Sequence, residues 1–311
     1  MEIPLPPPEK LIFVHRQPNG VAYVIINRPK SLNSLTRSMM GDLAKAIKSL
    51  DSDNSVRVII LSGSGRAFCS GVDLTAAEDV FKGDVKDVET DPVAQMERCK
   101  KPIIGAINGF AVTAGFEIAL ACDLLVASKE AKFMDTHARF GIFPSWGLSQ
   151  KLSRIIGPSR AREVSLTAMA VTAEQAERWG LVNHVVEGSE LLKKARQIAE
   201  AIIKNNEDLV LRYKAVINDG LNKILVMHLL WRRWNFAIIN DRGKKEKGFW
   251  LWMVSLETSK IGPPSDLNSH FYLYQLQERA HEYYAGMTKE QFKKMQEFIA
   301  GRSSKKTPSK L

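Results

Sequence analysis

Hydrophobic positions along the first two hundred residues alternate between short β-branched runs and longer stretches at helical spacing. Residues 22–27 and 56–61 are runs rich in Val and Ile, and residues 39–50 between them carry apolar side chains three or four positions apart. This pattern predicts a strand, then a helix, then a strand. Further strands are predicted at 103–107, 124–127 and 181–186, and further helices at 147–156, 161–166, 191–203 and from Thr172. Such alternation indicates an α/β fold with ligand sites in loops at strand ends.

Two turns of small residues, at 69–74 and 108–115, are the most informative local feature. N–H groups fixed at two such turns can bind a carbonyl oxygen that becomes negative during a reaction. Residues 118–125 are nearly all apolar, which predicts a buried helix from about Ala114 with Glu117 in its first turn. The positive end of that helix favours an ionised Glu117 and burial opposes it, so this side chain is a candidate base. A capping or salt-bridged glutamate is the structural alternative.

Composition indicates a globular chain with a sizeable core. The 311 residues are 45% hydrophobic and 25% charged, which fits one large domain, alone or with an extension, and excludes a wholly disordered protein. The three cysteines have neither paired nor metal-ligand spacing, so we expect a reducing compartment and no metal site. Residues 1–10 contain four prolines instead of an apolar signal core, and secretion is not expected.

The basic charge is concentrated in one segment. The net charge is +10, and residues 222–260 hold eight Lys or Arg against three Asp or Glu. An excess of this size suits nucleic acid, an anionic membrane or a phosphate-bearing ligand, and composition does not choose among them. Residues 221–240 are long enough for a membrane span, but Arg232 and Arg233 near the centre argue against one.

Several motifs resemble landmarks of the crotonase, or enoyl-CoA hydratase/isomerase, family. They are Asn-Arg-Pro at 27–29, Phe-Cys-Ser-Gly-Val-Asp-Leu at 68–74, Lys-Pro-Ile-Ile-Gly-Ala-Ile-Asn-Gly at 101–109 and Ala-Cys-Asp at 121–123. The run at 135–141 and the final tripeptide are most similar to plant-type monofunctional hydratases of peroxisomes. The resemblance implies an α/β fold, a crotonase-like spiral of ββα repeats with a C-terminal helical region, assembled as homotrimers or hexamers.

The resemblance also implies a domain organisation. Residues 1–10 are expected to be a flexible N-terminus, residues 11–204 the spiral core, and residues 205–300 the C-terminal helical region. An atypical insertion at about 222–274, with four of the six tryptophans, interrupts that region, and a basic tail follows at 301–311. The insertion is either a basic, aromatic surface for RNA or membrane, or an aberrant or alternatively spliced stretch that packs loosely.

The resemblance implies that Val72 and Ala114 donate the two oxyanion-hole N–H groups to the thioester oxygen. The Val72, Asp73, Leu74 and Thr75 loop is then expected to bind the adenine end of coenzyme A. Because only backbone groups act in the hole, valine and alanine can stand where alanine and glycine are more usual. No cofactor is expected, since coenzyme A is part of the acyl-CoA substrate.

The chain departs from the family at one catalytic position. Glu117 matches the first of the two glutamates that family hydratases use, but His137 stands in place of the second. If this segment is extended, Asp135 and His137 face the same way. We therefore hypothesise that His137 replaces the glutamate as proton donor, oriented by Asp135. The alternative is a structural loop histidine, which leaves a one-carboxylate enzyme of slower or altered activity.

The chain ends in Ser309-Lys310-Leu311, the tripeptide read by the peroxisomal import receptor. The function expected from all these features is a peroxisomal enoyl-CoA hydratase of fatty-acid β-oxidation, which converts trans-2-enoyl-CoA to 3-hydroxyacyl-CoA. Alternatives on the same scaffold are an enoyl-CoA isomerase and an acyl-CoA hydrolase or decarboxylase. A catalytically weak acyl-CoA- or RNA-binding protein is the alternative from another class, and DNA is not an expected partner.

Overall fold

The computed structural model describes residues 4–73, 75 and 87–219, and their elements follow one another in ββα units. The first two units are β1 (Ile12–Arg16), β2 (Val21–Ile26) and α1 (Arg37–Ser52), then β3 (Val58–Gly63), β4 (Ala67–Cys69) and α3 (Pro92–Arg98). The next two are β5 (Ile103–Ile107), β6 (Phe110–Val112) and α4 (Ala114–Leu120), then β7 (Leu124–Ser128), β8 (Lys132–Met134) and α5 (His137–Phe140). This order confirms the predicted spiral of ββα repeats.

Further elements complete the described part of the chain. They are α6 (Leu148–Ile156), α7 (Pro158–Thr167), β9 (Val171–Thr172), α8 (Ala173–Arg178), β10 (His184–Val186) and α9 (Leu191–Ile203), with 3₁₀ turns η1 (Pro29–Ser31) and η3 (Gly188–Glu190). Residues 207–219 are also helical. The predicted insertion at 222–274, the tail at 301–311 and Leu74 lie outside the described residues.

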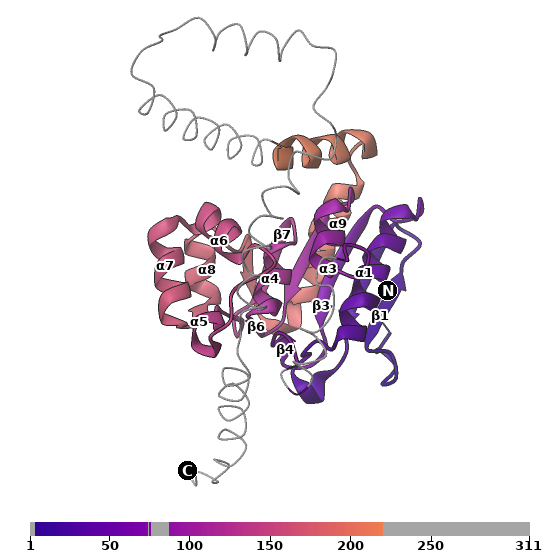
Figure 1. The fold of residues 1–311 in the computed structure, drawn as a ribbon. Coiled ribbons are helices and arrows are strands. Elements are labelled where there is room, and N and C mark those ends of the chain that lie inside the picture. Colours follow the sequence, from indigo (N-terminus) through magenta and orange to yellow (C-terminus); the bar gives the residue numbers. More distant parts are fainter. Residues whose placement is uncertain (1–3, 74, 76–86, 220–311) are drawn as a thin grey trace, which may run out of the picture. The chain divides into compact units, whose positions relative to one another are not determined.

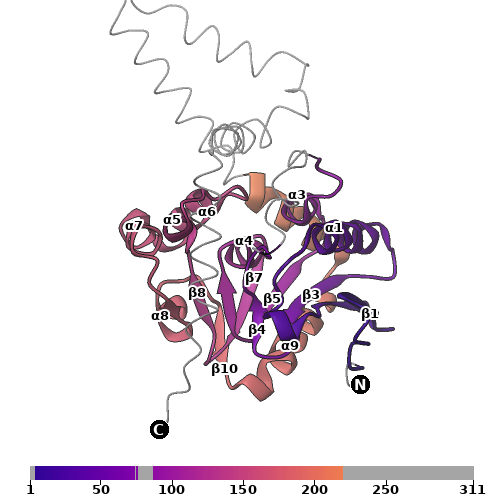
Figure 2. The same cartoon turned by 60° about the horizontal axis from the view of Figure 1, so that its bottom comes forward.

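The two strands of the second, third and fourth repeats enter different sheets, whereas β1 and β2 of the first repeat pair with each other. The larger sheet has the order β1-β2-β3-β5-β7-β10 and is parallel except for the β1–β2 pair, whereas the smaller sheet has the order β4-β6-β8-β9. In Figures 1 and 2, α5, α6, α7 and α8 gather at one side of these sheets and α1 and α3 at the other, with α4 between. The helices of the four repeats therefore lie in succession across the sheets, with α4 in the middle.

Alternating residues of the larger sheet pack on opposite faces. Val24, Ile59 and Leu61 belong to the core shared with α1, α3 and α4, while Tyr23 and Ile60 belong to the core covered by α9. This is the period of two that a strand imposes on its side chains. Burying a Leu or Ile fully stabilises the fold by roughly 1.5–3 kcal/mol, so both faces contribute to the free energy of folding.

Local sequence explains where α1 begins and which side it buries. Thr36 is extended and its hydroxyl accepts a hydrogen bond from the Met39 N–H, which satisfies one free amide of the first turn. Met39, Leu43 and Ile47 repeat every four residues and are fully buried. The predicted helix at 39–50 is confirmed with a start two residues earlier.

The predicted strand at 181–186 is shorter in the structure. Gly180 has φ +78° and ends the turn after α8, so Leu181 and Val182 enter the core as loop residues before β10 begins at His184. Here apolar character marks burial in a loop and not an extended strand.

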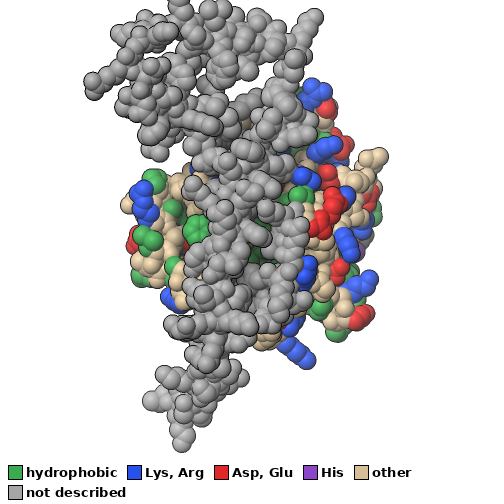
Figure 3. All heavy atoms as spheres, in the orientation of Figure 1, with side chains coloured by type: hydrophobic (Ala, Val, Ile, Leu, Met, Phe, Trp, Pro, Cys, Tyr) green, Lys and Arg blue, Asp and Glu red, His purple; other side chains and the backbone are tan. Residues whose placement is uncertain are grey.

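Charge is mixed over the described surface that Figure 3 presents, where Lys and Arg side chains are interspersed with Asp and Glu. None of the described helices is both long and apolar enough to cross a membrane. Within the described ranges, no group of three or more His, Cys, Asp or Glu is arranged to hold a metal ion.

Candidate active site

Two glycines allow the small-residue turns at 69–72 and 113–115 to lie against each other. A Cβ added to Gly115 would lie 2.1 Å from the carbonyl oxygen of Cys69. Gly71 has φ +100°, and a Cβ there would lie 2.6 Å from the Thr113 Oγ1. Both positions exclude a side chain, and the two turns, some forty residues apart in the sequence, form one backbone surface.

Val72 and Ala114 present their amides at this surface. Leu35 donates its N–H to the Gly71 oxygen and accepts from the Asp73 N–H, both at 2.8 Å. In this parallel bridge the Val72 N–H points away from Leu35. Ala114 is the first residue of α4, where helical amides have no partner within the helix. Both residues line one cavity of about 1050 Å³.

The backbone is strained directly before Ala114. Thr113 has φ 49° and ψ −116°, a backbone conformation that residues other than glycine rarely adopt. Strain of this kind costs of order 1–3 kcal/mol and persists only where neighbouring structure imposes it. Its position beside one of the two cavity amides indicates that this turn is shaped for a ligand and not for stability alone.

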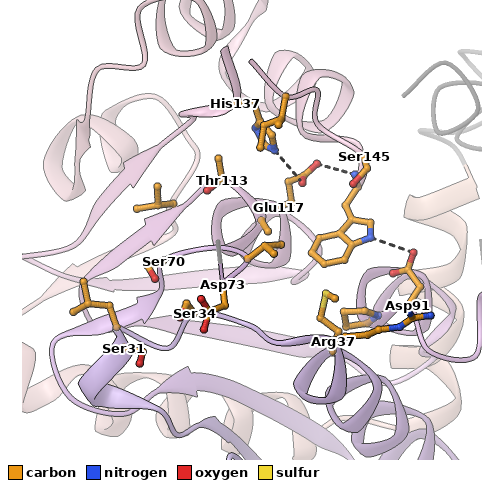
Figure 4. Close-up of a pocket in the computed structure, with 18 of the residues that line it drawn as sticks. Ser31, Ser34, Arg37, Ser70, Asp73, Asp91, Thr113, Glu117, His137 and Ser145 are labelled. Carbon is orange, nitrogen blue, oxygen red and sulfur yellow. Dashed lines mark hydrogen bonds and ion pairs between the residues drawn. The ribbon is translucent and has the colours of Figure 1, made fainter. Parts of the chain in front are cut away.

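Glu117 lies on the first turn of α4 and is 1% exposed. Its Oε1 accepts hydrogen bonds from the backbone N–H of Trp146 at 2.8 Å and of Leu148 at 3.3 Å. The carboxylate also lines the cavity, and Figure 4 shows it next to His137. Glu117 thus makes the contacts expected of the structural alternative, a capping or salt-bridged glutamate. Its carboxylate nevertheless remains at the wall of the cavity.

His137 contacts both neighbouring carboxylates. Its Nε2 lies 3.6 Å from Glu117 Oε2, and its Nδ1 lies 2.6 Å from Asp135 Oδ1. His137 and Glu117 are therefore close enough to act on one substrate. All three residues are buried, with exposures of 5% or less.

The segment from Asp135 to His137 is not extended, so the condition under which both side chains would face the same way is not met. Strand β8 ends at Met134, and His137 is the first residue of α5. The Asp135 carboxylate instead accepts the His137 backbone N–H at 3.2 Å, a short turn that an aspartate side chain favours. The turn brings the carboxylate and the imidazole together even though the segment is not a strand.

The two carboxylates hold His137 in its charged form. Burial lowers the pKa of His137, but hydrogen bonds and charge from Asp135 and Glu117 outweigh burial and raise that pKa from 6.5 to about 9. Burial alone would raise the pKa of Asp135, but the hydrogen bond and charge of His137 outweigh burial and lower that pKa. The imidazole is therefore an acid at neutral pH, placed between two buried carboxylates.

The loop expected to bind coenzyme A lies at the same cavity in its described part. Val72, Asp73 and Thr75 line the cavity, and Leu74 lies outside the described residues. The Asp73 carboxylate accepts hydrogen bonds from Arg28 and from the Thr75 hydroxyl, and these contacts outweigh burial and lower the pKa of Asp73. An ionised Asp73 therefore fixes the loop that carries the Val72 amide.

Sequence reasoning missed two residues of the site, Asp91 and Trp146. Trp146 holds Glu117 through its backbone N–H, and its indole Nε1–H donates to Asp91 Oδ2 at 3.2 Å (Figure 4). The signal available was the Pro-Ser-Trp-Gly run at 144–147, which precedes a helix and predicts a turn. A turn alone does not say that its amides face a glutamate thirty residues away.

Comparisons with known proteins cover most of the chain. The family model described as enoyl-CoA hydratase/isomerase matches residues 16–253. A probable peroxisomal enoyl-CoA hydratase 1 of Arabidopsis thaliana is 63% identical over 303 residues, covering 97% of this chain and 98% of the relative. A short-chain-enoyl-CoA hydratase of Clostridium acetobutylicum is 38% identical over 205 residues, covering 65% and 78%. The crystal structure of an enoyl-CoA hydratase from Mycobacterium tuberculosis is 36% identical, with a TM-score of 0.62, covering 71% of this chain and 94% of that one.

Proposed function

The chain belongs to the enoyl-CoA hydratase/isomerase family, and we propose that it hydrates trans-2-enoyl-CoA with Glu117 and His137 as its two proton carriers. The product is the 3-hydroxyacyl-CoA. The observation that carries this assignment is the direct contact of the Glu117 carboxylate with the His137 imidazole, in a cavity that Val72 and Ala114 also line. Hydration needs one group that takes a proton from water and another that gives a proton to carbon, and this pair offers both.

Substrate binding uses backbone groups. The thioester oxygen accepts hydrogen bonds from the Val72 and Ala114 N–H groups, and the described loop residues Val72, Asp73 and Thr75 contact the coenzyme A portion. Negative charge grows on the thioester oxygen as the enolate forms, so the two amides bind the transition state more tightly than the ground state. Losing one such donor typically costs about 2.7–4 kcal/mol of activation free energy.

The proton transfers balance within the pair. The Glu117 carboxylate takes a proton from water while the oxygen bonds to C3, and the C2–C3 π electrons move to give the enolate. The His137 imidazolium then donates its Nε2 proton to C2, and the thioester carbonyl re-forms. Glu117 is now protonated and His137 neutral. One transfer across their 3.6 Å contact restores both groups.

Asp135 orients the donor. Its Oδ1 lies on the Nδ1 side of the imidazole, so Nε2 is the nitrogen that faces Glu117 and the cavity. A carboxylate on the far nitrogen also stabilises the charged imidazole, which keeps the proton available until the enolate forms. Asp135 is therefore a positioning residue, whereas His137 is catalytic. The reaction written in this way uses no resident cofactor, since coenzyme A arrives with the substrate.

The proposal extends to location and partners. The Arabidopsis relative is named as peroxisomal, and this chain acts in fatty-acid β-oxidation in the peroxisome. We propose that the import receptor reads Ser309-Lys310-Leu311 and that copies of the chain associate as a trimer or hexamer. Removal of residues 309–311 is expected to leave catalysis intact and the protein in the cytosol. Import of the truncated chain in cells without full-length subunits would contradict the receptor assignment.

The activity is tested by hydration of crotonyl-CoA, followed through loss of absorbance of the conjugated thioester. Glu117→Gln keeps the shape of the side chain and removes proton transfer, and kcat is expected to fall by about 10²- to 10⁴-fold. Glu163→Gln, at an exposed position on α7, is the matched control and should be fully active. Activity of Glu117→Gln within a few-fold of wild type would overturn the mechanism, and salt-sensitive RNA binding without turnover would favour the binding protein.

A further inference from the structure

Asp91 sits where the cavity meets α3 and uses both of its carboxylate oxygens. Oδ1 accepts the Ala94 N–H at 2.9 Å and caps α3, while Oδ2 accepts the Trp146 indole Nε1–H at 3.2 Å. The two donors come from different elements. Asp91 therefore connects the start of α3 to the loop before α6, and the side chain is 8% exposed.

Trp146 carries this connection to the catalytic carboxylate. Its backbone N–H donates to Glu117 Oε1 at 2.8 Å, the shorter of the two amide contacts on that oxygen. The indole is 7% exposed, and it anchors the loop that precedes α6. An indole held by Asp91 restrains the loop that carries the Trp146 backbone N–H. The indole contact thus bears on the direction in which the Glu117 carboxylate faces.

We propose that Asp91 is a positioning residue for hydration, which holds the Trp146 indole so that the Trp146 backbone N–H fixes Glu117 Oε1. The inference rests on the proposed function, in which Glu117 is the base toward water. With Oε1 held by Trp146, Oε2 is the oxygen that faces His137. Asp91, through the loop before α6, and His137, from α5, thereby act on the two oxygens of the Glu117 carboxylate.

The surroundings of Asp91 argue that this carboxylate has more than a capping role. Burial, together with the nearby charge of Glu97, raises the pKa of Asp91 to about 6, although the hydrogen bonds from Ala94 and Trp146 lower it. Glu97 itself pairs with Lys151 of α6 at 2.6 Å. A serine or threonine caps a helix about as well without a buried charge. A carboxylate provides the second acceptor oxygen that the indole requires.

Two substitutions remove the indole contact from opposite ends. Trp146→Phe keeps an aromatic ring and loses the N–H donor, and Asp91→Ser keeps a helix cap and loses the second acceptor. We expect kcat for crotonyl-CoA to fall about 10-fold in each, with KM within about 2-fold, because a misplaced base slows chemistry more than binding. The kcat of the double variant should be within about 2-fold of the kcat of the less active single variant, because both substitutions remove the same interaction.

The matched control is Thr172→Ala, which removes the capping box of α8. Thr172 does not line the cavity. This substitution should lower the melting temperature and leave kcat unchanged. In the Glu117→Gln background, Trp146→Phe should cause no further loss of kcat. Any of four results would overturn the positioning role of Asp91. They are multiplicative losses of kcat in the double variant, unchanged kcat in both single variants, a rise in KM alone, and an equal loss of kcat in Thr172→Ala. Full activity of Glu117→Gln itself would instead contradict the proposed function.

Discussion

The Nε2 of His137 lies 3.6 Å from the Oε2 of Glu117, so the two groups proposed to exchange protons with the substrate also contact each other. This contact has two consequences. It stabilises the imidazolium, and it allows the pair to return to its starting protonation state without a separate proton carrier. Family hydratases are expected to use two glutamates, which repel each other when both are ionised. A histidine facing a glutamate attracts it instead, and this difference governs the expected pH behaviour.

His137→Ala is expected to lower the rate of hydration and to remove the alkaline limb of the pH profile. The donor must be protonated, and its pKa is raised to about 9, so wild-type activity should persist through neutrality and fall as pH rises through about 9. The histidine's ordinary pKa near 6.5 would have placed this limb near neutrality. Steady-state rates from pH 6 to pH 10 measure the limb.

His137→Glu is the companion variant, because it recreates the two-glutamate arrangement. Part of the rate lost in His137→Ala should return. An alanine variant with an unchanged rate and an unchanged alkaline limb would rule out His137 as the second proton carrier and leave Glu117 alone with water.

Asp135→Asn should move the alkaline limb to lower pH. The asparagine keeps an acceptor oxygen near Nδ1 but removes a negative charge that raises the pKa of His137. A lower pKa means that the imidazole loses its proton at lower pH, so the decline in activity begins earlier. The acidic limb and KM should change little. An alkaline limb that stays near pH 9 in Asp135→Asn would show that Asp135 does not support the charged imidazole.

The stability of the fold should also depend on the protonation of His137. Its pKa is about 9 in the folded chain and near 6.5 in the unfolded chain, so folding favours the protonated form. The contribution is fully present below pH 6.5 and is lost as pH rises through 9; it amounts to a few kcal/mol at most. Melting temperatures of wild type and His137→Gln, compared at pH 6 and pH 9.5, measure it. An equal decline in both proteins would assign the alkaline destabilisation to other groups.

The periodic elements of the fold could be predicted because their signal is local. The apolar repeat of Met39, Leu43 and Ile47 predicts α1, and the runs rich in Val and Ile predict β2, β3 and β5 with bounds close to those observed. Each pattern reflects which face of one element is buried. Where apolar residues enter the core from a loop, as Leu181 does, the same signal gives a wrong strand.

The site could be predicted only in part, because half of it consists of backbone groups. Glu117 and His137 are visible as titratable residues in recognisable positions. The amide that holds Glu117 belongs to Trp146, and every residue except proline offers such an amide, so no side-chain type marks it. Thr113 likewise gives no sign that its φ is 49°, since the conformation is imposed by the packing of two distant turns.

Gly115→Ala is expected to impair catalysis through the oxyanion hole, without any change in an ionisable group. The new methyl group would lie 2.1 Å from the Cys69 carbonyl oxygen, so the 113–115 turn and the 69–72 turn must separate. Ala114 then no longer presents its N–H beside that of Val72, and kcat should fall by about 10²- to 10³-fold, the typical effect of one lost donor. Gly188→Ala is the matched control, because a Cβ at Gly188 meets its nearest atom at an ordinary 3.4 Å and the residue lies in η3, outside the cavity lining. Both variants should be assayed at a temperature where circular dichroism shows them folded, since overpacking also destabilises by typically 1–3 kcal/mol. A folded Gly115→Ala enzyme with the kcat of Gly188→Ala would show that the two turns do not form the oxyanion hole.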